Sequence, residues 1–354
     1  MNFRMNPRPG FVLRGLSRPD LHLSTPFTLP FASYSTAATT GSISTQSRDR
    51  QTVTLPDGRQ LGFAQYGSPS GKPIFYFHGY PASRRECAPI SDVAKEKSIR
   101  LISVDRPGIG ASTYQPDRAF HDWPQDVKVL ADALDLKRFA VIGASGGGPY
   151  AIACALSLPP DRLSISAVFA GAPSWEFGAK HISTARKTLA YLAERWPNFL
   201  IRLVNSTVSA SRWVLQRKWV QGKINAWLTT VMKKAKENDG ESFEKPTREQ
   251  LDEIREQTAG PFFDHFDQGA KGFAHETQLL VRPWGFSFED VKGRVQIYHG
   301  AKDTNAPAEM IRLMAEKMPN CDLQIFEDDN HYTMGRHMLK VMAKLVSEEQ
   351  NKRV

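Results

Sequence analysis

A serine flanked by glycines is the first candidate for covalent chemistry in this sequence. Residues 143–147 read Gly-Ala-Ser-Gly-Gly, directly after the apolar run 139–142 and before the helix-forming run 149–158. A strand that turns abruptly into a helix leaves no room for side chains at the flanking positions, so glycines there permit a strained turn that exposes the serine hydroxyl. Ser145 is therefore the candidate nucleophile, and the start of the following helix favours negative charge beside it.

A serine hydroxyl is a weak nucleophile at neutral pH, so it requires a base and an acid that orients the base. Both residue types follow predicted strands later in the chain, as Asp303 and then His331. The order Ser, Asp, His is the one expected when the serine sits on a strand-to-helix turn of a parallel sheet. Asp328 and Asp329 are alternative acids, but residues so close to the histidine on one loop usually cannot reach its far ring nitrogen. We predict Ser145 as nucleophile, His331 as general base and Asp303 as the orienting acid.

The same chemistry needs backbone N–H groups that stabilise the oxyanion of a tetrahedral intermediate. One donor is expected from Gly146, immediately after the serine. The other is expected after the strand 73–78, where Gly79 allows a sharp turn and directs the N–H of Tyr80 toward the same point. We therefore predict an oxyanion hole formed by Tyr80 and Gly146.

Other polar residues near these motifs are interpreted as structural. Asp105 and Arg106 precede Pro-Gly-Ile-Gly, a turn whose loop their side chains can fix through hydrogen bonds. His78 is interpreted as a residue that orders the neighbouring loop. No metal site is predicted, because five further histidines show no ligand spacing that requires one. These are His121, His181, His265, His275 and His337.

The strands and helices that must position these residues can be predicted from the sequence. Short apolar runs alternate with helical segments, a pattern typical of a parallel sheet covered by helices. The first two predicted strands are separated by Pro-Asp-Gly at 56–58, so they are expected to form a hairpin at an antiparallel edge. The other six are expected to be parallel. The predicted strands are 51–55, 60–66, 73–78, 100–104, 138–143, 165–170, 294–299 and 322–327.

The alternation stops between 174 and 290, where helical segments follow one another without a convincing strand. The clearest helix start there is Thr247, which with Gln250 forms a capping-box pattern. We predict a helical cap over 174–290, inserted into a core made of 48–173 and 291–354.

The first 47 residues form a leader rich in arginine and serine, with four arginines and the single acid Asp20. This composition is typical of a mitochondrial presequence, and the continuous apolar segment of a secretory signal is absent. The alternative is a disordered tail that targets nothing, in a cytoplasmic protein. Prolines at 7, 9 and 19 interrupt any amphipathic helix there.

Several motifs together are typical of one superfamily. The chain resembles, over roughly residues 50–350, the α/β-hydrolase fold superfamily, as an esterase- or lipase-like serine hydrolase with a helical cap. The resemblance implies an α/β fold with an eight-stranded, mostly parallel sheet flanked by helices. The motifs are His-Gly-Tyr-Pro at 78–81, Asp-Arg-Pro-Gly-Ile-Gly-Ala-Ser at 105–112, Gly-Ala-Ser-Gly-Gly at 143–147, Asp303 within Gly-Ala-Lys-Asp at 300–303, and His331.

The resemblance also limits the chemistry. Haloalkane dehalogenases and epoxide hydrolases carry an aspartate where this sequence has Ser145, so acyl chemistry is implied instead. The segments 146–151 and 282–285 resemble a broad set of microbial hydrolases whose substrates are mostly unassigned. We expect hydrolysis of a small to medium lipophilic ester through an acyl-enzyme, with no cofactor. The same residues also support perhydrolysis and the hydrolysis of thioesters, lactones, amides or C–C bonds. If the protein is not an enzyme, the alternative is a ligand receptor of the same fold.

The net charge of +9 has two sources, the leader and the segment 212–236, and no nucleic-acid motif accompanies either. We therefore predict a small-molecule substrate and no nucleic-acid partner. Within 212–236 seven Lys or Arg and no acid are interleaved with Trp213, Trp219 and Trp227. This stretch is either a solvated basic face, or a face that docks on an anionic membrane or guides an acidic or CoA-type substrate.

Composition gives two further expectations. No stretch approaches the roughly 18 apolar residues of a spanning helix, so we expect a soluble protein. A reducing compartment is the simplest interpretation of three cysteines that are far apart in sequence and form no CxxC pair. They are Cys87, Cys154 and Cys321.

Overall fold

The computed structural model describes residues 41–180, 182–238 and 242–350. The predicted presequence therefore lies, up to residue 40, outside the described residues.

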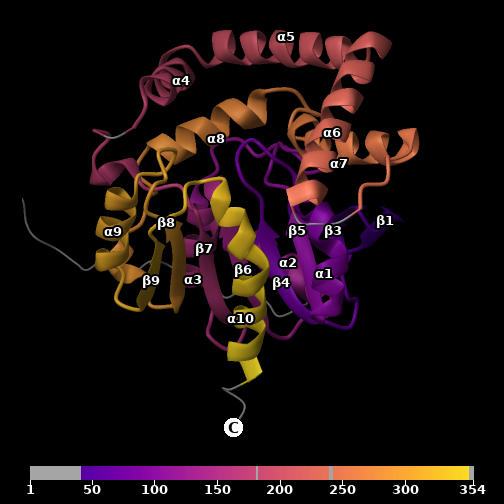
Figure 1. The fold of residues 1–354 in the computed structure, drawn as a ribbon. Helices are drawn as coiled ribbons and strands as arrows, with labels where there is room; N and C mark the ends of the chain where they lie inside the picture. The colour runs from indigo at the N-terminus through magenta and orange to yellow at the C-terminus, as the bar shows by residue number, and fades with distance from the viewer. Residues whose placement is uncertain (1–40, 181, 239–241, 351–354) are drawn as a thin grey trace, which may run out of the picture. The chain divides into compact units, whose positions relative to one another are not determined.

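A single nine-stranded sheet organises the described chain, in the order β1-β2-β3-β5-β4-β6-β7-β8-β9 (Figure 1). Each of the eight predicted strands has its counterpart, within one or two residues at most ends, in β2 to β9. The ninth strand, β1, lies inside the segment predicted as leader, so the sheet has nine strands where eight were expected. The strands are β1 (Ile43–Ser47), β2 (Arg50–Thr54), β3 (Gln60–Gly67), β4 (Lys72–Phe77), β5 (Ile99–Val104), β6 (Phe139–Ala144), β7 (Leu163–Phe169), β8 (Val295–Gly300) and β9 (Cys321–Phe326).

Pairing along the sheet changes from antiparallel to parallel. Antiparallel pairs join β1 to β2, β2 to β3 and β3 to β5. The remaining pairs, along the order β5, β4, β6, β7, β8 and β9, are parallel. In this register Phe77 at the end of β4 lies opposite Gly143 near the end of β6. The carboxyl ends of parallel strands thus meet at one edge, where ligand sites of open α/β sheets form.

Helices cover both faces of the parallel strands. Alternate residues of β4 show the division, because Phe75 and Phe77 belong to one apolar core and Ile74 and Tyr76 to the other. Figure 1 shows α1 and α10 in front of the sheet. The first core includes residues of α2 (Trp123–Ala133), α3 (Gly148–Ser157) and α9 (Ala308–Lys317), and the second includes residues of α1 (Ser91–Glu96) and α10 (Met338–Gln350).

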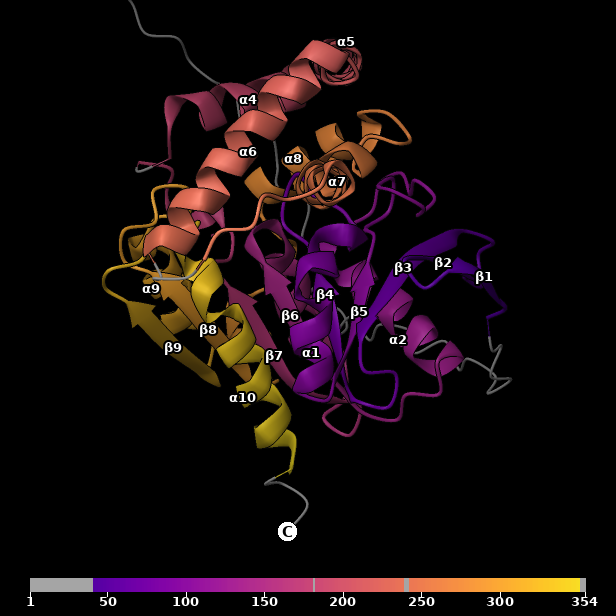
Figure 2. The same ribbon diagram turned by 45° about the vertical axis from the view of Figure 1, so that its right-hand side comes forward.

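Five α-helices of the described chain are inserted between β7 and β8, in the interval for which a helical cap was predicted. Thr247 and Gln250 form the predicted capping box, with reciprocal side-chain to backbone hydrogen bonds of 3.2 and 2.8 Å. Figures 1 and 2 show α8 on the sheet side of this group, α5 on its outer side, and α6 descending from α5. None of the helices in the described ranges is long and apolar enough to cross a membrane. The inserted helices are α4 (Thr184–Arg195), α5 (Pro197–Leu215), α6 (Lys218–Asn238), α7 (Arg248–Asp264) and α8 (Lys271–Val281).

Candidate active site

Ser145 lies at the turn between β6 and α3, in a backbone conformation that side chains rarely adopt. Its φ is +48°, in the left-handed region. A Cβ atom added at Gly143 would lie 2.2 Å from the carbonyl oxygen of Gly147, and one added at Gly147 would lie 2.1 Å from that of Phe77. Both glycines are therefore required by close backbone approach, as the sequence pattern predicted for this turn.

The structure brings the three predicted catalytic residues together from the ends of three different strands. His331, in the loop after β9, has its Nε2 atom 3.1 Å from the Oγ atom of Ser145. Its Nδ1 atom lies 2.7 Å from the Oδ2 atom of Asp303, in the loop after β8. With the carboxylate as acceptor, Nδ1 carries the proton and Nε2 is left to accept one from the serine hydroxyl.

The carboxylate of Asp303 is buried, and both of its oxygen atoms take part in hydrogen bonds. Its Oδ1 atom accepts hydrogen bonds of 2.8 Å from the N–H groups of Asn305 and Ala306, which leaves Oδ2 for His331. Burial lowers the pKa of the neighbouring His299, although the charge of Asp303 opposes this shift, so His299 stays neutral at pH 7. The sequence analysis had not singled out His299, whose Nε2 atom lies 2.7 Å from the carbonyl oxygen of Ala306.

The two alternative acids have other partners. Asp328 forms an ion pair of 3.0 Å with Lys302 at the surface. Asp329 accepts from Arg336 at 2.9 Å and from His337 at 2.8 Å. Neither carboxylate contacts the imidazole of His331, as the argument from loop length predicted.

Tyr80 and Gly146, the predicted oxyanion donors, lie side by side. A Cβ atom added at Gly146 would be 2.6 Å from the Cβ atom of Tyr80 and 3.4 Å from its backbone nitrogen. The N–H of Tyr80 donates to no other group in the part of the chain that the structure describes. A free N–H next to the serine is what the predicted role requires.

The loop that carries Tyr80 is fixed by Glu86, a residue that the sequence analysis missed. Glu86 lies in the short helix η1 (Arg84–Ile90) and accepts hydrogen bonds from the N–H of Gly79 at 2.8 Å and the hydroxyl of Tyr76 at 2.9 Å. Burial raises the pKa of Glu86, and the hydrogen bonds from Gly79 and Tyr76 oppose that rise. The contact between Glu86 and Gly79 depends on how η1 packs against this loop, and no local sequence pattern indicates it.

Arg106, predicted to be structural, connects the same loop to the inserted helices. Its guanidinium donates to the carbonyl oxygens of His78 and Gly79 and pairs at 2.8 Å with Glu276 of α8. Glu276 is fully buried and also pairs with Arg118 at 2.6 Å. The charges of the two arginines lower the pKa of Glu276 despite its burial. This ion-pair triad ties α8 to the loop that follows β4.

The side chain of Tyr80 is held by α8 as well. Its hydroxyl lies 2.5 Å from the Oγ1 atom of Thr277 and donates at 3.0 Å to the carbonyl oxygen of Phe273. Its ring is stacked on that of Phe273, with centroids 5.0 Å apart, and His265 packs against both rings. The inserted helices therefore position Tyr80, the residue predicted to supply an oxyanion donor.

A positive charge from α4 lies near the site. Arg186 is half-buried and forms no ion pair with any carboxylate among the described residues. Burial lowers its pKa, whereas Asp303, Tyr80 and Tyr332 are close enough to oppose that shift. The inserted helices thus contribute a charged group as well as aromatic rings.

The family follows from a comparison with known proteins. Residues 72–337 match the family model described as the alpha/beta hydrolase fold. The chain belongs to the α/β-hydrolase fold family. The predicted family and α/β fold class are confirmed, and the expected mostly parallel sheet agrees with the strand order described above.

The similar proteins within this family have diverse names. A 125-residue segment is 30% identical to a non-heme chloroperoxidase from Streptomyces lividans, and covers 34% of this chain and 45% of that protein. A 116-residue segment is 32% identical to a proline iminopeptidase from Xylella fastidiosa, and covers 31% of this chain and 36% of that protein. The chain thus spans less than half the length of these curated relatives.

Similarity to solved structures extends over most of the chain. The esterase RhEst1 from Rhodococcus sp. ECU1013 matches with a TM-score of 0.55 and 16% identity, over 85% of this chain and 99% of that one. An enol-lactonase from Burkholderia xenovorans LB400 matches with a TM-score of 0.53 and 16% identity, over 84% and 99%. At this identity the likeness establishes the α/β-hydrolase fold alone.

Proposed function

We propose that this protein is a serine hydrolase that cleaves carboxylic esters through an acyl-enzyme intermediate. The observation that carries the proposal is the hydrogen-bonded series from Ser145 through His331 to Asp303, with distances of 3.1 and 2.7 Å. A nucleophile, a base and an orienting carboxylate in this arrangement are the parts that acyl transfer requires. The names of the similar proteins support hydrolysis in general.

In the proposed reaction the Oγ atom of Ser145 attacks the ester carbonyl while the Nε2 atom of His331 takes up the hydroxyl proton. Asp303 holds the imidazole in the required tautomer and stabilises the imidazolium. The N–H groups of Tyr80 and Gly146 stabilise the oxyanion, and loss of one such donor typically costs a factor of about 10²–10³ in turnover. His331 then protonates the leaving alcohol, and water, activated by the same imidazole, releases the acid from Ser145.

The proposed substrate is a small to medium lipophilic ester. Aromatic side chains from α8 and the segment before it stand beside the loop that carries Tyr80. Phe273 stacks on Tyr80, and Phe266 packs against Phe273 with centroids 5.5 Å apart. Rings of this kind form the apolar walls of small-molecule sites. Thioester, lactone and C–C bond hydrolysis use the same nucleophile, and only product analysis separates them from ester hydrolysis.

The test uses the full chain, because β1 belongs to the sheet and a chain starting at residue 48 would lack it. The protein is treated with a fluorophosphonate probe and assayed with p-nitrophenyl esters of increasing chain length. Labelling and turnover are expected in the wild type and in Ser70→Ala, which changes an exposed serine. Both should disappear in Ser145→Ala.

A folded wild-type protein that neither labels nor turns over any ester would contradict the proposal and favour a ligand receptor of this fold. Labelling that persists in Ser145→Ala would assign the nucleophile to another residue. The chain-length dependence of kcat/KM then measures how large an acyl group the site accepts.

A further inference from the structure

Three large aromatic side chains are exposed on α5 and α6. Trp213, Trp219 and Trp227 have exposed fractions of 60%, 66% and 64%. Aromatic side chains of this size supply much of the energy of cores and interfaces, so three exposed ones close together in sequence point to a partner. We use the term basic aromatic face for the first two of these residues and the cations beside them. The face consists of Trp213, Arg217, Lys218, Trp219 and Lys223, whereas Trp227 also lines a cavity on the inner side of α6.

The cations of this face stand over the exposed rings. The guanidinium of Arg217 lies 3.7 Å from the ring centroid of Trp213, and the ammonium of Lys223 lies 5.4 Å from that of Trp219. Arg217, Lys218 and Lys223 form no ion pair with a carboxylate in the described part of the chain. Positive charge is therefore concentrated beside apolar rings and is not neutralised locally.

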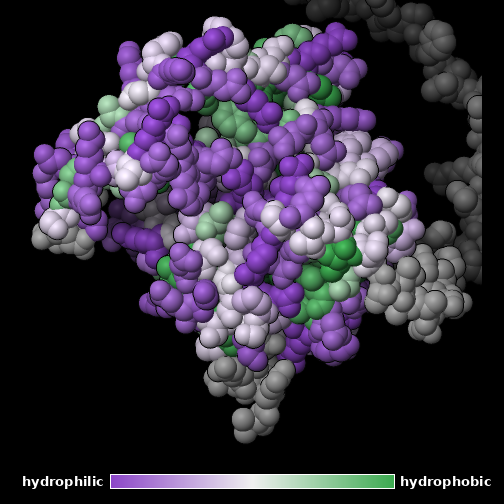
Figure 3. Space-filling model, turned by 90° about the vertical axis from the view of Figure 1, so that its right-hand side faces the viewer, coloured by the Kyte–Doolittle hydropathy of each residue, from purple (hydrophilic) through white to green (hydrophobic). Residues whose placement is uncertain are grey.

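The part of the face that belongs to α6 lies on the outer side of that helix. In α6 the half-buried positions 220, 221, 224 and 228 recur with helical spacing, while Trp219 and Lys223 lie on the opposite side and are exposed. Figure 2 shows α5 at the outer end of the inserted helices, with α6 descending from it past α7 and α8. Figure 3 shows a mainly hydrophilic surface, on which hydrophobic areas form separate patches.

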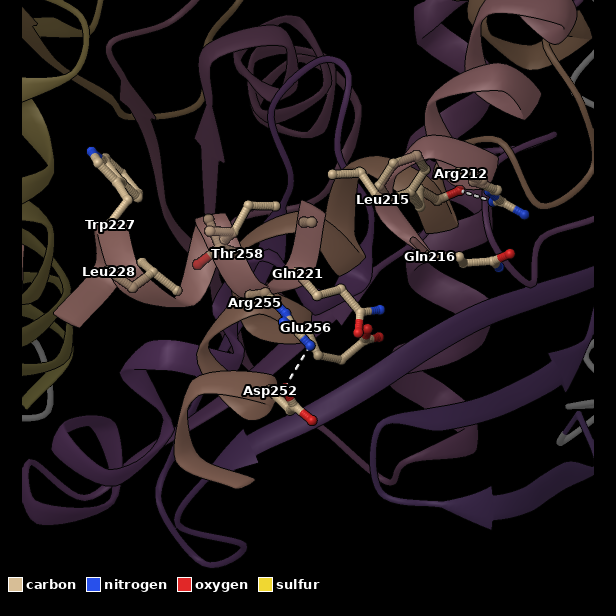
Figure 4. A pocket seen from close by; sticks show the side chains of 13 residues that line it. Arg212, Leu215, Gln216, Gln221, Trp227, Leu228, Asp252, Arg255, Glu256 and Thr258 are labelled. Atoms are coloured by element: carbon tan, nitrogen blue, oxygen red, sulfur yellow. Dashed lines mark hydrogen bonds and ion pairs between the residues drawn. The ribbon is translucent and has the colours of Figure 1, made fainter. Parts of the chain in front are cut away.

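The inner side of α6 is loosely packed. A cavity of about 420 Å³ separates parts of α5, α6 and α7, and Leu215, Trp227 and Phe263 each contribute to its lining (Figure 4). The lining includes none of the predicted catalytic residues. No described side chain of α6 is fully buried. A partner on the outer side would therefore add contacts that this helix lacks in the isolated chain.

We propose that the basic aromatic face docks the protein peripherally on anionic membrane surfaces. Anionic headgroups neutralise the unpaired cations, and tryptophan rings favour the boundary between headgroups and acyl chains. A second copy of this chain would instead bring two surfaces of like charge together, which is unfavourable. The helix would lie in the plane of the interface, because no helix among the described residues is suited to cross the bilayer.

The test is cosedimentation of the full-length protein with vesicles of phosphatidylcholine, alone or mixed with phosphatidylserine. The wild type should bind the mixed vesicles, bind phosphatidylcholine alone much more weakly, and dissociate as salt is raised. The variant Arg217→Glu/Lys218→Glu/Lys223→Glu should bind the mixed vesicles at least about a hundredfold more weakly, since each basic residue near such a surface contributes about a factor of five. Trp219→Ala should also weaken binding, and tryptophan emission of the wild type should shift to the blue on binding.

The matched control is Lys95→Glu/Lys97→Glu/Lys340→Glu, which makes the same change in net charge at exposed positions on α1, directly after α1 and on α10. It should bind like the wild type. Equal loss in both triple variants would show that net charge alone is responsible and would overturn the proposed face. Failure of the wild type to bind mixed vesicles, or binding that salt leaves unchanged, would also overturn it, as would self-association through α6 in the absence of lipid. Binding is measured without turnover, so the result is independent of the proposed esterase function.

Discussion

Removal of the Glu86 carboxylate should impair turnover, although Glu86 contacts neither the serine nor the histidine. In Glu86→Ala the N–H of Gly79 loses the acceptor that lies 2.8 Å away. An unpaired buried N–H costs about 1–3 kcal/mol, and the loop can avoid this cost by moving toward another acceptor. Such a movement displaces the adjacent N–H of Tyr80 from the position of the oxyanion.

The expected loss in kcat follows from these quantities. A cost of about 1–3 kcal/mol corresponds to a factor of about 5–150, and complete loss of one oxyanion donor sets an upper limit of about 10²–10³. We therefore expect kcat of Glu86→Ala to fall about 10- to 100-fold with little change in KM, because the interaction is used mainly in the transition state. The assay is steady-state hydrolysis of p-nitrophenyl acetate, with urea unfolding to verify that the variant is folded.

Tyr76→Phe is the matched control, because it removes the other hydrogen bond to Glu86 and leaves the bond from Gly79 in place. Its kcat should stay within about threefold of the wild type, the effect of a single hydrogen bond that does not touch the loop. The reasoning is refuted if Glu86→Ala also keeps kcat within about threefold while its stability falls. In that case the hydrogen bonds from Arg106 to the carbonyl oxygens of His78 and Gly79 are sufficient to hold the loop.

Further predictions concern stability, pH and targeting. Glu276→Gln leaves two arginines in a buried site without their carboxylate and should lower the free energy of unfolding in urea by about 3–5 kcal/mol. Glu256→Gln removes the charge of one partner of an exposed ion pair and should lower the free energy of unfolding by less than about 1 kcal/mol. Burial lowers the pKa of His265 to about 4. On acidification the unfolded chain therefore takes up this proton before the folded protein does, and the free energy of unfolding should fall by about 3 kcal/mol between pH 6.5 and 4. In His265→Asn the free energy of unfolding should depend less on pH over this range. Since His331 must be neutral to act as base, kcat/KM should fall when the solution is acidified, and a kcat/KM that does not change with pH would exclude this role. Residues 1–47 fused to a fluorescent protein should direct it to mitochondria, and a diffuse cytoplasmic signal would favour the untargeted tail.

The sequence was sufficient where local patterns determine the structure. The apolar run before Ser145 and the glycines around it predict a strand, a tight turn and a helix within about twenty residues, and all three were found. Asp303 and His331 were predictable because each follows a buried strand in an order that fits one sheet. The strand β1 was missed because Ile43 is the only apolar residue among its five, and an exposed edge strand needs no apolar alternation.

Several contacts missed by sequence analysis join segments that are far apart in the chain. Thr277 lies nearly two hundred residues after Tyr80, and its hydroxyl has no local pattern that indicates a partner in a loop of the core. The same holds for Glu276, which looks like an ordinary helical glutamate until the fold places two arginines beside it. The helix α8 contacts the side chain of Tyr80 and, through Arg106, anchors the loop that carries Tyr80. Substitutions in the inserted helices should therefore change the position of this loop as well as the shape of the substrate site. Specificity and turnover are therefore expected to be coupled in this protein, and neither is set by the triad alone.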